Sequence, residues 1–404
     1  MTFKEFNFSQ QLLEGIDAIG FENATPIQEQ AIPVIMQGKD LIASAQTGTG
    51  KTAAFLLPII NQIMEGPQDE KIKALIIVPT RELAMQIDQQ MEGLSYFTNV
   101  SSISVYGGSG GSEFTREKQA LTQGVDVIIG TPGRLIAHLN MGYGNFENLQ
   151  FLVLDEADRM LDMGFHDDIV KILSHLPKKR QNLLFSATMP KKIKELANKI
   201  LHDPEEISLA VSKPAERVYQ YAFIVYEEQK IPVLKHMLSA KPLNSVLIFC
   251  STKIKAKQVR KELKNLNFDV QEIHSDLDQK ERNEVLAAFK NKKLNYLVAT
   301  DILSRGIDVE DIELVVNFDV PGDVEDYIHR IGRTARAASK GIAFTFVSVE
   351  DQRKYNAIEK HLGYPLTKGK IPEKFGETPE LKTYSGKPGG KRKFTKKSNK
   401  KRSS

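Results

Sequence analysis

Residues 40–60 read "DLIASAQTGTGKTAAFLLPII" and set a glycine-rich turn between an apolar run and a helical pattern. The run at 41–44 is short and apolar, which predicts a buried strand. The apolar residues that follow Thr52 predict an amphipathic helix. Gly48 and Gly50 let the backbone turn tightly between these two elements, because glycine takes positive φ without steric cost. The stretch therefore predicts a strand, a loop and a helix of an α/β domain.

The same alternation of strands and helices fills two halves of the chain. Short apolar runs separated by helix-length segments predict mostly parallel sheets with helices on both faces. We expect two doubly wound domains, at 1–207 and 218–367, joined by a linker at 208–217 near two prolines. The predicted strands are "LIAS", "ALIIV", "ISVY", "DVIIG", "FLVL" and "LLFS", then "YAFIV", "SVLIF", "DVQEI", "NYLVA", "LVVNF" and "IAFTF".

Composition narrows the class of protein. No stretch approaches 18 apolar residues, and the N-terminus "MTFKEFNFSQ" has no basic start, so we expect neither a membrane span nor a signal peptide. The single cysteine, Cys250, ends the run "SVLIFC" and is expected to be a buried thiol. With no internal disulfide available, a cytoplasmic location fits.

Basic charge is concentrated at the C-terminus. Residues 382–404 hold ten Lys or Arg and no acid, which leaves 45 basic and 51 acidic residues in 1–381. We expect a disordered, low-complexity tail over 368–404, too polar to fold alone and able to neutralise phosphates without reading sequence. The alternative is a tail that only improves solubility.

The opening stretch also predicts a site for a nucleoside triphosphate. Lys51 supplies a positive charge and Thr52 a hydroxyl for Mg²⁺ at a helix N-terminus. Ala45 stands where the general pattern has glycine. In "FLVLDEADRMLD", residues 151–162, Asp155 ends a predicted strand and can hold the Mg²⁺, partly through water, while Glu156 can orient the attacking water. The alternatives are a coincidental glycine turn and an acidic turn that begins an exposed helix.

An ordered set of motifs resembles the DEAD-box RNA helicases. The motifs are "AQTGTGKT" at 45, "PTREL" at 79, "TPGR" at 131, "DEAD" at 155, "SAT" at 186, "RGID" at 305 and "HRIGRTAR" at 329. The resemblance runs from residue 3 to about 365. It implies two RecA-like domains with ATP between them and RNA across both. It also implies RNA-stimulated ATP hydrolysis coupled to closure, RNA bending and local unwinding, largely independent of sequence.

The resemblance assigns an adenine-recognition segment, 1–29, and an ATP site. Gln28 would pair with the adenine edge and Phe3 would stack on the ring, although Phe3 can instead pack as a hydrophobic staple before a helix near Ser9. The segment has Ala24 where many members have proline. The implied ATP-binding residues are Phe3, Thr25, Gln28, Ala45, Gln46, Thr47, Gly48, Thr49, Gly50, Lys51, Thr52 and Asp308.

The second half has neither a "GKT" loop nor a "DE" pair, so we expect one hydrolytic cleft. By resemblance, Ser186 and Thr188 link Asp158 to His329 across the domains. Arg330, Arg333 and Arg336 have a spacing that predicts one helical face, and the last two would stabilise the transferring phosphoryl group. The implied catalytic residues are Lys51, Asp155, Glu156, Arg333 and Arg336. Ser304 and Ala335 stand where many members have alanine and glycine.

The implied RNA contacts are arginine, hydroxyl and backbone groups, which suit sugar and phosphate. They are Arg81, Gly107, Gly108, Thr131, Gly133, Arg134, Gln279, Arg282 and Thr300. Two other functions remain open: a DNA helicase or translocase, and an ATP-gated RNA clamp that does not unwind. The short basic tail resembles that of the bacterial RhlE-like branch, which points to ribosome-assembly or RNA-decay proteins as partners.

Overall fold

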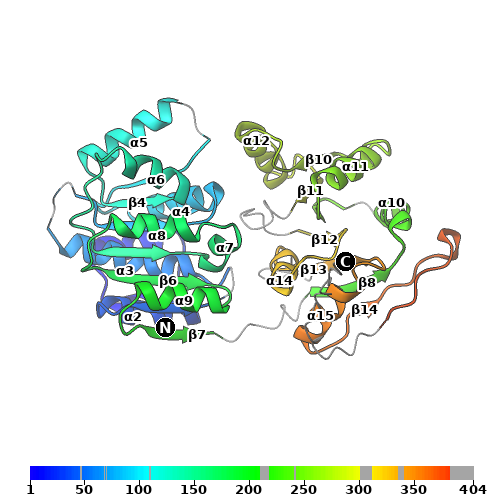
Figure 1. The fold of residues 1–404 in the computed structure, drawn as a ribbon, viewed down its shortest axis with the longest axis horizontal. Helices are drawn as coiled ribbons and strands as arrows, with labels where there is room; N and C mark the ends of the chain where they lie inside the picture. Colours follow the sequence, from blue (N-terminus) through cyan, green and yellow to red (C-terminus); the bar gives the residue numbers. More distant parts are fainter. Residues whose placement is uncertain are drawn as a thin grey trace, which may run out of the picture.

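The chain forms two seven-stranded sheets that lie side by side, the first on the left of Figure 1 and the second on the right. The structure, a computed structural model, describes residues 1–45, 48–67, 69, 71–108, 111–209, 218–240, 243–300, 312–334 and 341–382. Within each sheet, every pair of neighbouring strands is parallel. The predicted fold class, two tandem RecA-like α/β domains, is confirmed.

The first sheet has the order β3-β4-β2-β5-β6-β1-β7. Its strands are β1 Leu41–Ser44, β2 Ala74–Ile77, β3 Ser102–Val105, β4 Val127–Gly130, β5 Phe151–Leu154, β6 Gln181–Ser186 and β7 Glu205–Ser208. This order sets β5, β6 and β1 next to one another, so the loops after them meet at one edge. That edge is where ligands bind in open α/β sheets.

Helices cover both faces of the first sheet because successive strand residues point to opposite sides. One face packs on α1 Gln10–Ala18, α2 Pro26–Met36, α3 Lys51–Glu65 and α4 Arg81–Leu94. The other packs on α5 Gly111–Gln123, α6 Pro132–Asn140, α7 Ala157–Asp162, α8 His166–Ser174 and α9 Lys191–Ile200. Along β5, Val153 contributes to the first core and Leu152 to the second. Strand β5 therefore contributes side chains to two separate hydrophobic cores, one on each face of the sheet.

The second sheet has the order β10-β11-β9-β12-β13-β8-β14. Its strands are β8 Val218–Ile224, β9 Val246–Cys250, β10 Val270–Ile273, β11 Tyr296–Thr300, β12 Leu314–Asn317, β13 Gly341–Val347 and β14 Thr367–Lys368. Its helices are α10 Lys230–Ala240, α11 Lys253–Lys264, α12 Gln279–Lys290, α14 Val324–Ile331 and α15 Gln352–Leu362, with the short turns η2 Glu227–Gln229 and η3 Glu373–Phe375. A further short turn, η1 Phe3–Phe6, packs in the core of the first domain. Cys250 is fully buried within the core.

Each sheet has one strand that the sequence analysis did not predict. Strand β7 enters the expected linker, 208–217, of which residues 210–217 lie outside the described residues. Strand β14 and the chain as far as Lys382 pack on the second domain, with Leu381 partly buried against its core. We call residues 369–382 the C-terminal strap. The expected tail, 368–404, therefore begins within a packed segment, and its residues 383–404 lie outside the described residues.

Across the described ranges, no helix is both long and apolar enough to cross a membrane.

Candidate functional site

The predicted phosphate loop ends in a backbone shape that requires glycine. Gly48 and Gly50 have φ of +80° and +91°, and Gly50 is the N-cap of α3. A Cβ on Gly50 would lie 2.6 Å from Gln28 Nε2 and 2.9 Å from Thr25 Oγ1. Both the dihedral angle and the close contact therefore exclude a side chain here. Gln46 and Thr47 lie outside the described residues.

Gln28 joins the expected adenine segment to this loop. Thr25 is the N-cap of α2, and its backbone N–H donates to Gln28 Oε1 at 2.8 Å. Gln28 Nε2 donates to the carbonyl of Gly50 at 3.0 Å. Each end of the amide thus has one protein partner, and the second N–H of Nε2 and the second lone pair of Oε1 can still pair with a base.

Phe3 lies beside the same segment but inside the core. The backbone of Ala24 donates to the carbonyl of Met1 at 2.9 Å, which holds the N-terminus next to the Gln28 turn. The Phe3 ring is only 3% exposed, with its centroid 6.1 Å from those of Phe6 and Phe21. This placement favours the hydrophobic-packing alternative, since stacking on adenine needs the ring to move.

A buried charge pair stands at the head of the loop. Lys51, the first residue of α3, donates from Nζ to the carbonyl of Ala45 at 2.8 Å. Asp155 follows β5 and is 3% exposed. Burial raises its pKa to about 6; the positive charge of Lys51 opposes the rise, and the charges of Glu156 and Asp158 add to it. A cation would relieve this repulsion.

The residues present fit a magnesium ion better than a protein-only metal cage. In the part of the chain that the structure describes, no group of three or more His, Cys, Asp or Glu could hold a metal. Magnesium usually takes one or two carboxylates and completes its shell with phosphate and water. Asp155, with Thr52 in the first turn of α3, offers ligands of that kind.

Glu156 has an uncommon backbone conformation. Its φ is +49°, in the left-handed region, and it is the N-cap of α7. Such residues cost about 1–3 kcal/mol and concentrate at functional sites. Its Oε2 lies 3.1 Å from Arg159 Nη1, and its backbone N–H donates to Asp155 Oδ1 at 2.9 Å. These contacts fix the carboxylate beside the phosphate loop.

Asp158 is joined to Thr188 directly. Its Oδ2 accepts from the Thr188 hydroxyl at 3.0 Å and from the backbone N–H groups of Ala187 and Thr188 at 3.1 and 2.9 Å. Ser186 instead donates to the carbonyl of Thr188 at 2.6 Å. Ser186 therefore supports the turn that carries Thr188.

A cavity of about 430 Å³ is lined by residues of both domains. The first domain contributes Lys51, Glu156, Asp158 and Thr188, and the second contributes Asp323 and His329 of the α14 region. The structure therefore brings three of the four expected coupling residues, Asp158, Thr188 and His329, to one cavity.

The expectation of one helical face for the three arginines is wrong. Helix α14 ends at Ile331, so Arg333 lies in the following turn. Arg330 turns into the domain and is 1% exposed, while Arg333 is also buried. Gly332 is the C-cap of α14. Arg336 and Asp308 lie outside the described residues.

The expected RNA-contact residues of the first domain gather at the N-termini of α4 and α6, which follow the paired strands β2 and β4. Arg81 begins α4, and its guanidinium lies so close to Gly108 that a Cβ there would collide with it. Gly108 also has a φ of +87°. Thr131 is the N-cap of α6, and Gly133 faces open space.

Arg134 is held inside the protein by a group that the sequence analysis missed. Its Nε donates to Glu117 Oε2 at 2.6 Å, and its guanidinium lies 4.5 Å from the Phe114 ring. The buried Glu117 also contacts His138 Nε2 at 2.7 Å, and His138 Nδ1 contacts the Tyr143 hydroxyl. These residues come from α5 and α6, whose contact no sequence spacing indicated.

The expected RNA-contact residues of the second domain lie after β10 and at the end of β11. Gln279 begins α12. Arg282 Nη2 donates to the carbonyl of Ser275 at 3.0 Å. Thr300 ends β11 and is buried, with no hydrogen-bond partner for its hydroxyl among the residues that the structure describes.

Comparisons of sequence match both domains. The family model described as DEAD/DEAH box helicase matches residues 25–196, and that described as helicase conserved C-terminal domain matches 229–338. The chain is 41% identical over 359 residues to ATP-dependent RNA helicase CshA of Listeria monocytogenes, covering 89% of this chain and 68% of that protein. It is 38% identical over 371 residues to DbpA of Bacillus subtilis, covering 92% and 76%.

Solved structures match across both domains as well. S. cerevisiae Dbp5 bound to RNA and ADP BeF3 has a TM-score of 0.81 at 32% identity, covering 91% of this chain and 95% of that chain. A DEAD box protein from Methanococcus jannaschii has a TM-score of only 0.53 at 38% identity, covering 92% and 99%.

Proposed function

The chain belongs to the DEAD-box family of ATP-dependent RNA helicases, and from this membership we propose that it hydrolyses ATP in response to RNA and separates short duplexes locally. The observation that carries the proposal is the cavity to which Lys51, Glu156 and Asp158 come from one domain and His329 from the other. Because neither domain lines the cavity alone, hydrolysis depends on closure.

The first domain binds the nucleotide. We assign Ala45, Gln46, Thr47, Gly48, Thr49, Gly50, Lys51 and Thr52 to the triphosphate, with Thr25 and Gln28 at the base. Magnesium, when bound with ATP, neutralises the triphosphate and polarises its oxygens. Asp155 and Thr52 hold it, partly through water. Glu156 orients and deprotonates the attacking water, and its fixed backbone and its contact with Arg159 support that role.

The second domain completes the site on closure. His329 senses the state of the first domain through Thr188 and Asp158, which already share a hydrogen bond. Arg333 and Arg336 stabilise the charge that develops on the transferred phosphoryl group, an effect worth about 10³ to 10⁵ in rate for arginines of this kind. Asp308 contacts the ribose. Phe3 stacks on adenine only if its ring leaves the core.

RNA lies across both domains and is held through its backbone. The helix N-termini at Arg81 and Thr131, with the exposed Gly108 and Gly133, present amide groups and charge that suit phosphates. Gln279, Arg282 and Thr300 extend the track on the second domain. Arg134 acts through the turn that contains Thr131, because Glu117 already holds its guanidinium.

The test compares steady-state ATP hydrolysis without polymer, with RNA and with DNA of the same sequence. We expect strong stimulation by RNA and little by DNA. Equal stimulation by DNA would support a DNA translocase instead. Tight ATP-dependent retention of RNA with negligible turnover would support a clamp.

We also propose a cellular location, a role for the basic tail and a class of protein partners. A cytoplasmic location agrees with the absence of a spanning helix among the described residues, and residues 383–404 tether structured RNA through their positive charge. Ribosome-assembly or RNA-decay proteins are the proposed partners. The RhlE-like placement remains a prediction, since the relatives reported above are named CshA and DbpA.

A further inference from the structure

The two domains share one topology to the last strand. Each position in the second sheet holds the strand that comes seven later in the chain than the strand at the same position of the first. Strand β8 therefore corresponds to β1, which leads into the phosphate loop. Strand β12 corresponds to β5, which leads into Asp155. Residues that follow β8 and β12 stand where the first domain builds its nucleotide site.

A lysine and an aspartate occupy these two places. Lys230 is the first residue of α10, as Lys51 is the first residue of α3. Asp319 is the second residue after β12, as Glu156 is the second after β5. In the second domain the two groups meet, with Lys230 Nζ 2.8 Å from Asp319 Oδ1. The Lys230 side chain is 0% exposed.

The turn before α10 offers no cradle for a phosphate. Residues 225–229 contain no glycine, and none of these five has positive φ. The turn instead carries Glu227, whose two carboxylate oxygens lie 2.8 Å from Lys230 Nζ and 2.6 Å from Lys255 Nζ. The Glu227 carboxylate thus lies beside Lys230 where, by correspondence with the first domain, a phosphate of a bound nucleotide would lie.

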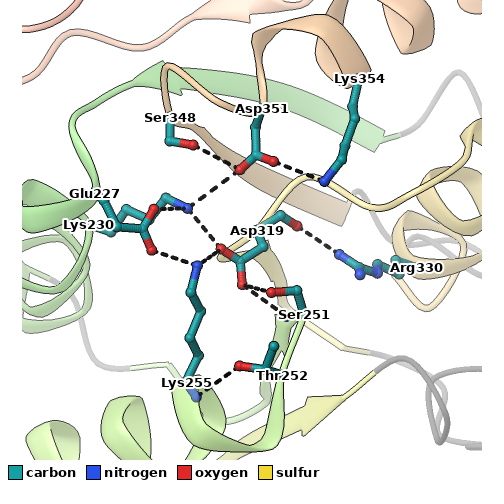
Figure 2. A network of polar contacts seen from close by, with 10 residues as sticks. All are labelled: Glu227, Lys230, Ser251, Thr252, Lys255, Asp319, Arg330, Ser348, Asp351 and Lys354. Atoms are coloured by element: carbon teal, nitrogen blue, oxygen red, sulfur yellow. Dashed lines mark hydrogen bonds and ion pairs between the residues drawn. The ribbon is translucent and has the colours of Figure 1, made fainter. Parts of the chain in front are cut away.

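The charges close into a network, shown in Figure 2. Asp319 also accepts from Lys255 Nζ at 2.7 Å and from the backbone N–H and hydroxyl of Ser251 at 2.9 and 2.8 Å. Burial would raise the pKa of Asp319, but the two lysines hold it well below its ordinary value. Asp351 lies 3.6 Å from Lys230 Nζ and 3.2 Å from Lys354 Nζ.

The C-terminal strap lies over both turns beside this network. Gln229 Nε2, next to Lys230, donates to the carbonyls of Phe375 and Glu377 at 2.7 and 2.9 Å. Gln352 Nε2, next to Asp351, donates to the carbonyl of Glu380 at 2.7 Å. The strap is therefore hydrogen-bonded on both sides of the position in the second domain that corresponds to the nucleotide site of the first.

The network also reaches the helix that faces the shared cavity. Arg330 Nη1 donates to the main-chain carbonyl of Asp319 at 3.0 Å and to Asn317 Oδ1 at 3.1 Å. Its guanidinium lies 5.0 Å from the Phe249 ring. Asp319 thus has its carboxylate fixed by four donors and its carbonyl fixed to α14. Helix α14 carries His329, and Arg333 follows it.

We propose that this network is the second domain's internal replacement for a bound nucleotide, and that Lys230 and Asp319 are positioning residues that orient α14 for ATP hydrolysis. The inference rests on the function proposed above. Buried ion pairs often add little stability over apolar side chains of similar volume, but they specify one geometry. Here the ion pairs fix the position of the chain at the end of β12, to which Arg330 is hydrogen-bonded.

The test separates stability from positioning with matched variants of the full-length protein. Lys230→Met and Asp319→Leu each leave a buried charge unbalanced, so each lowers the thermal unfolding midpoint. The double variant removes one charge of each sign and leaves Glu227 with Lys255 and Asp351 with Lys354. We expect it to regain the midpoint. Its RNA-stimulated kcat stays reduced by about 10-fold or more, because small misplacements of reacting groups are costly.

The KM for ATP and the affinity for a fluorescent ATP analogue stay near the wild-type values, since the first domain binds the nucleotide. The control is the double variant Lys235→Met with Glu262→Gln, which removes a half-exposed pair that also joins α10 to α11. We expect wild-type kcat from this control. A stable network variant with wild-type kcat would overturn the inference.

Arg330→Lys covers the case in which the double variant does not fold. It keeps the buried charge but has no planar fork to span Asn317 and the Asp319 carbonyl. Unchanged kcat in this variant would equally overturn the inference. Absence of RNA-stimulated hydrolysis in the wild type and the control would instead count against the proposed function.

Discussion

Replacing Arg134 with methionine should weaken RNA binding without changing its salt dependence, whereas replacing Arg81 should reduce the salt dependence. Arg134 Nε lies 2.6 Å from the buried carboxylate of Glu117. Its charge is already offset inside the protein, so it neutralises no RNA phosphate and displaces no counterion from the RNA. Arg81 begins α4, and its guanidinium lies beside Gly108 in the expected RNA-backbone track.

The size of the difference follows from counterion release. For single strands, log K falls with log salt by about 0.7 for each phosphate neutralised. Between 50 and 200 mM salt the concentration changes by about 0.6 log units, so one lost contact is worth about 0.4 log units, or roughly 2.6-fold in relative affinity. Arg134→Met should show none of this change.

The affinity itself should fall in Arg134→Met at every salt concentration. Breaking a buried pair by removing one partner costs about 3–5 kcal/mol locally, because Glu117 is left charged. That strain acts on the turn that contains Thr131 and Gly133. Adding Glu117→Gln to Arg134→Met removes the stranded charge, and we expect it to recover part of the affinity.

The assay is fluorescence anisotropy with a labelled single-stranded RNA and a non-hydrolysable ATP analogue at 50, 100 and 200 mM KCl. Arg81→Met is the positive control for a lost phosphate contact. A slope in Arg134→Met reduced as much as in Arg81→Met would refute the assignment, because Arg134 would then be a direct phosphate ligand.

Glu156→Gln should retain ATP and RNA binding but lose about 10²- to 10⁴-fold in single-turnover hydrolysis, the usual contribution of a general base; near-normal turnover would mean that the base is elsewhere. Gly50→Ala places a Cβ against Gln28 at positive φ, a cost of about 1–2 kcal/mol that should raise the ATP Kd roughly tenfold in nucleotide titrations. The pKa of Asp319 is lower in the folded protein than its ordinary value of 3.8, so the charged carboxylate stabilises the second domain above that pH. This stabilisation is lost as the pH falls through the pKa of Asp319 in the folded state. The thermal unfolding midpoint of the wild type should therefore fall as the pH is lowered from about 4 to 2. The midpoint of the double variant Lys230→Met with Asp319→Leu should fall less. Deleting 383–404 should raise the apparent RNA KM and flatten its salt dependence, with saturated turnover unchanged; an unaltered KM at low salt would argue against tethering.

Periodicity and motif order predicted the two α/β domains and the place of the phosphate loop, because buried parallel strands read as continuous apolar runs. The edge strands β7 and β14 escaped prediction. Only Ile207 is buried in β7, and both residues of β14 are exposed, so neither leaves an apolar run. The inward turn of Arg330 also escaped, since it depends on a helix end at Gly332 and on partners 11 and 13 residues upstream.

Glu117 shows a different limit. In the sequence it is one acid among the charged residues of an amphipathic helix, for which an exposed position is the ordinary expectation. Its burial depends on Arg134 and His138, which approach from a helix that follows another strand. Only the packing of α5 on α6 could reveal this pairing.

The hydrogen bond from Gln28 to the carbonyl of Gly50 joins the proposed base end of the pocket directly to its proposed phosphate end. A disturbance of the glutamine side chain is passed to the first turn of α3 without any intervening flexible segment. Inorganic tripolyphosphate, which carries the charge of ATP but no purine, should consequently bind far less tightly than its charge alone would suggest.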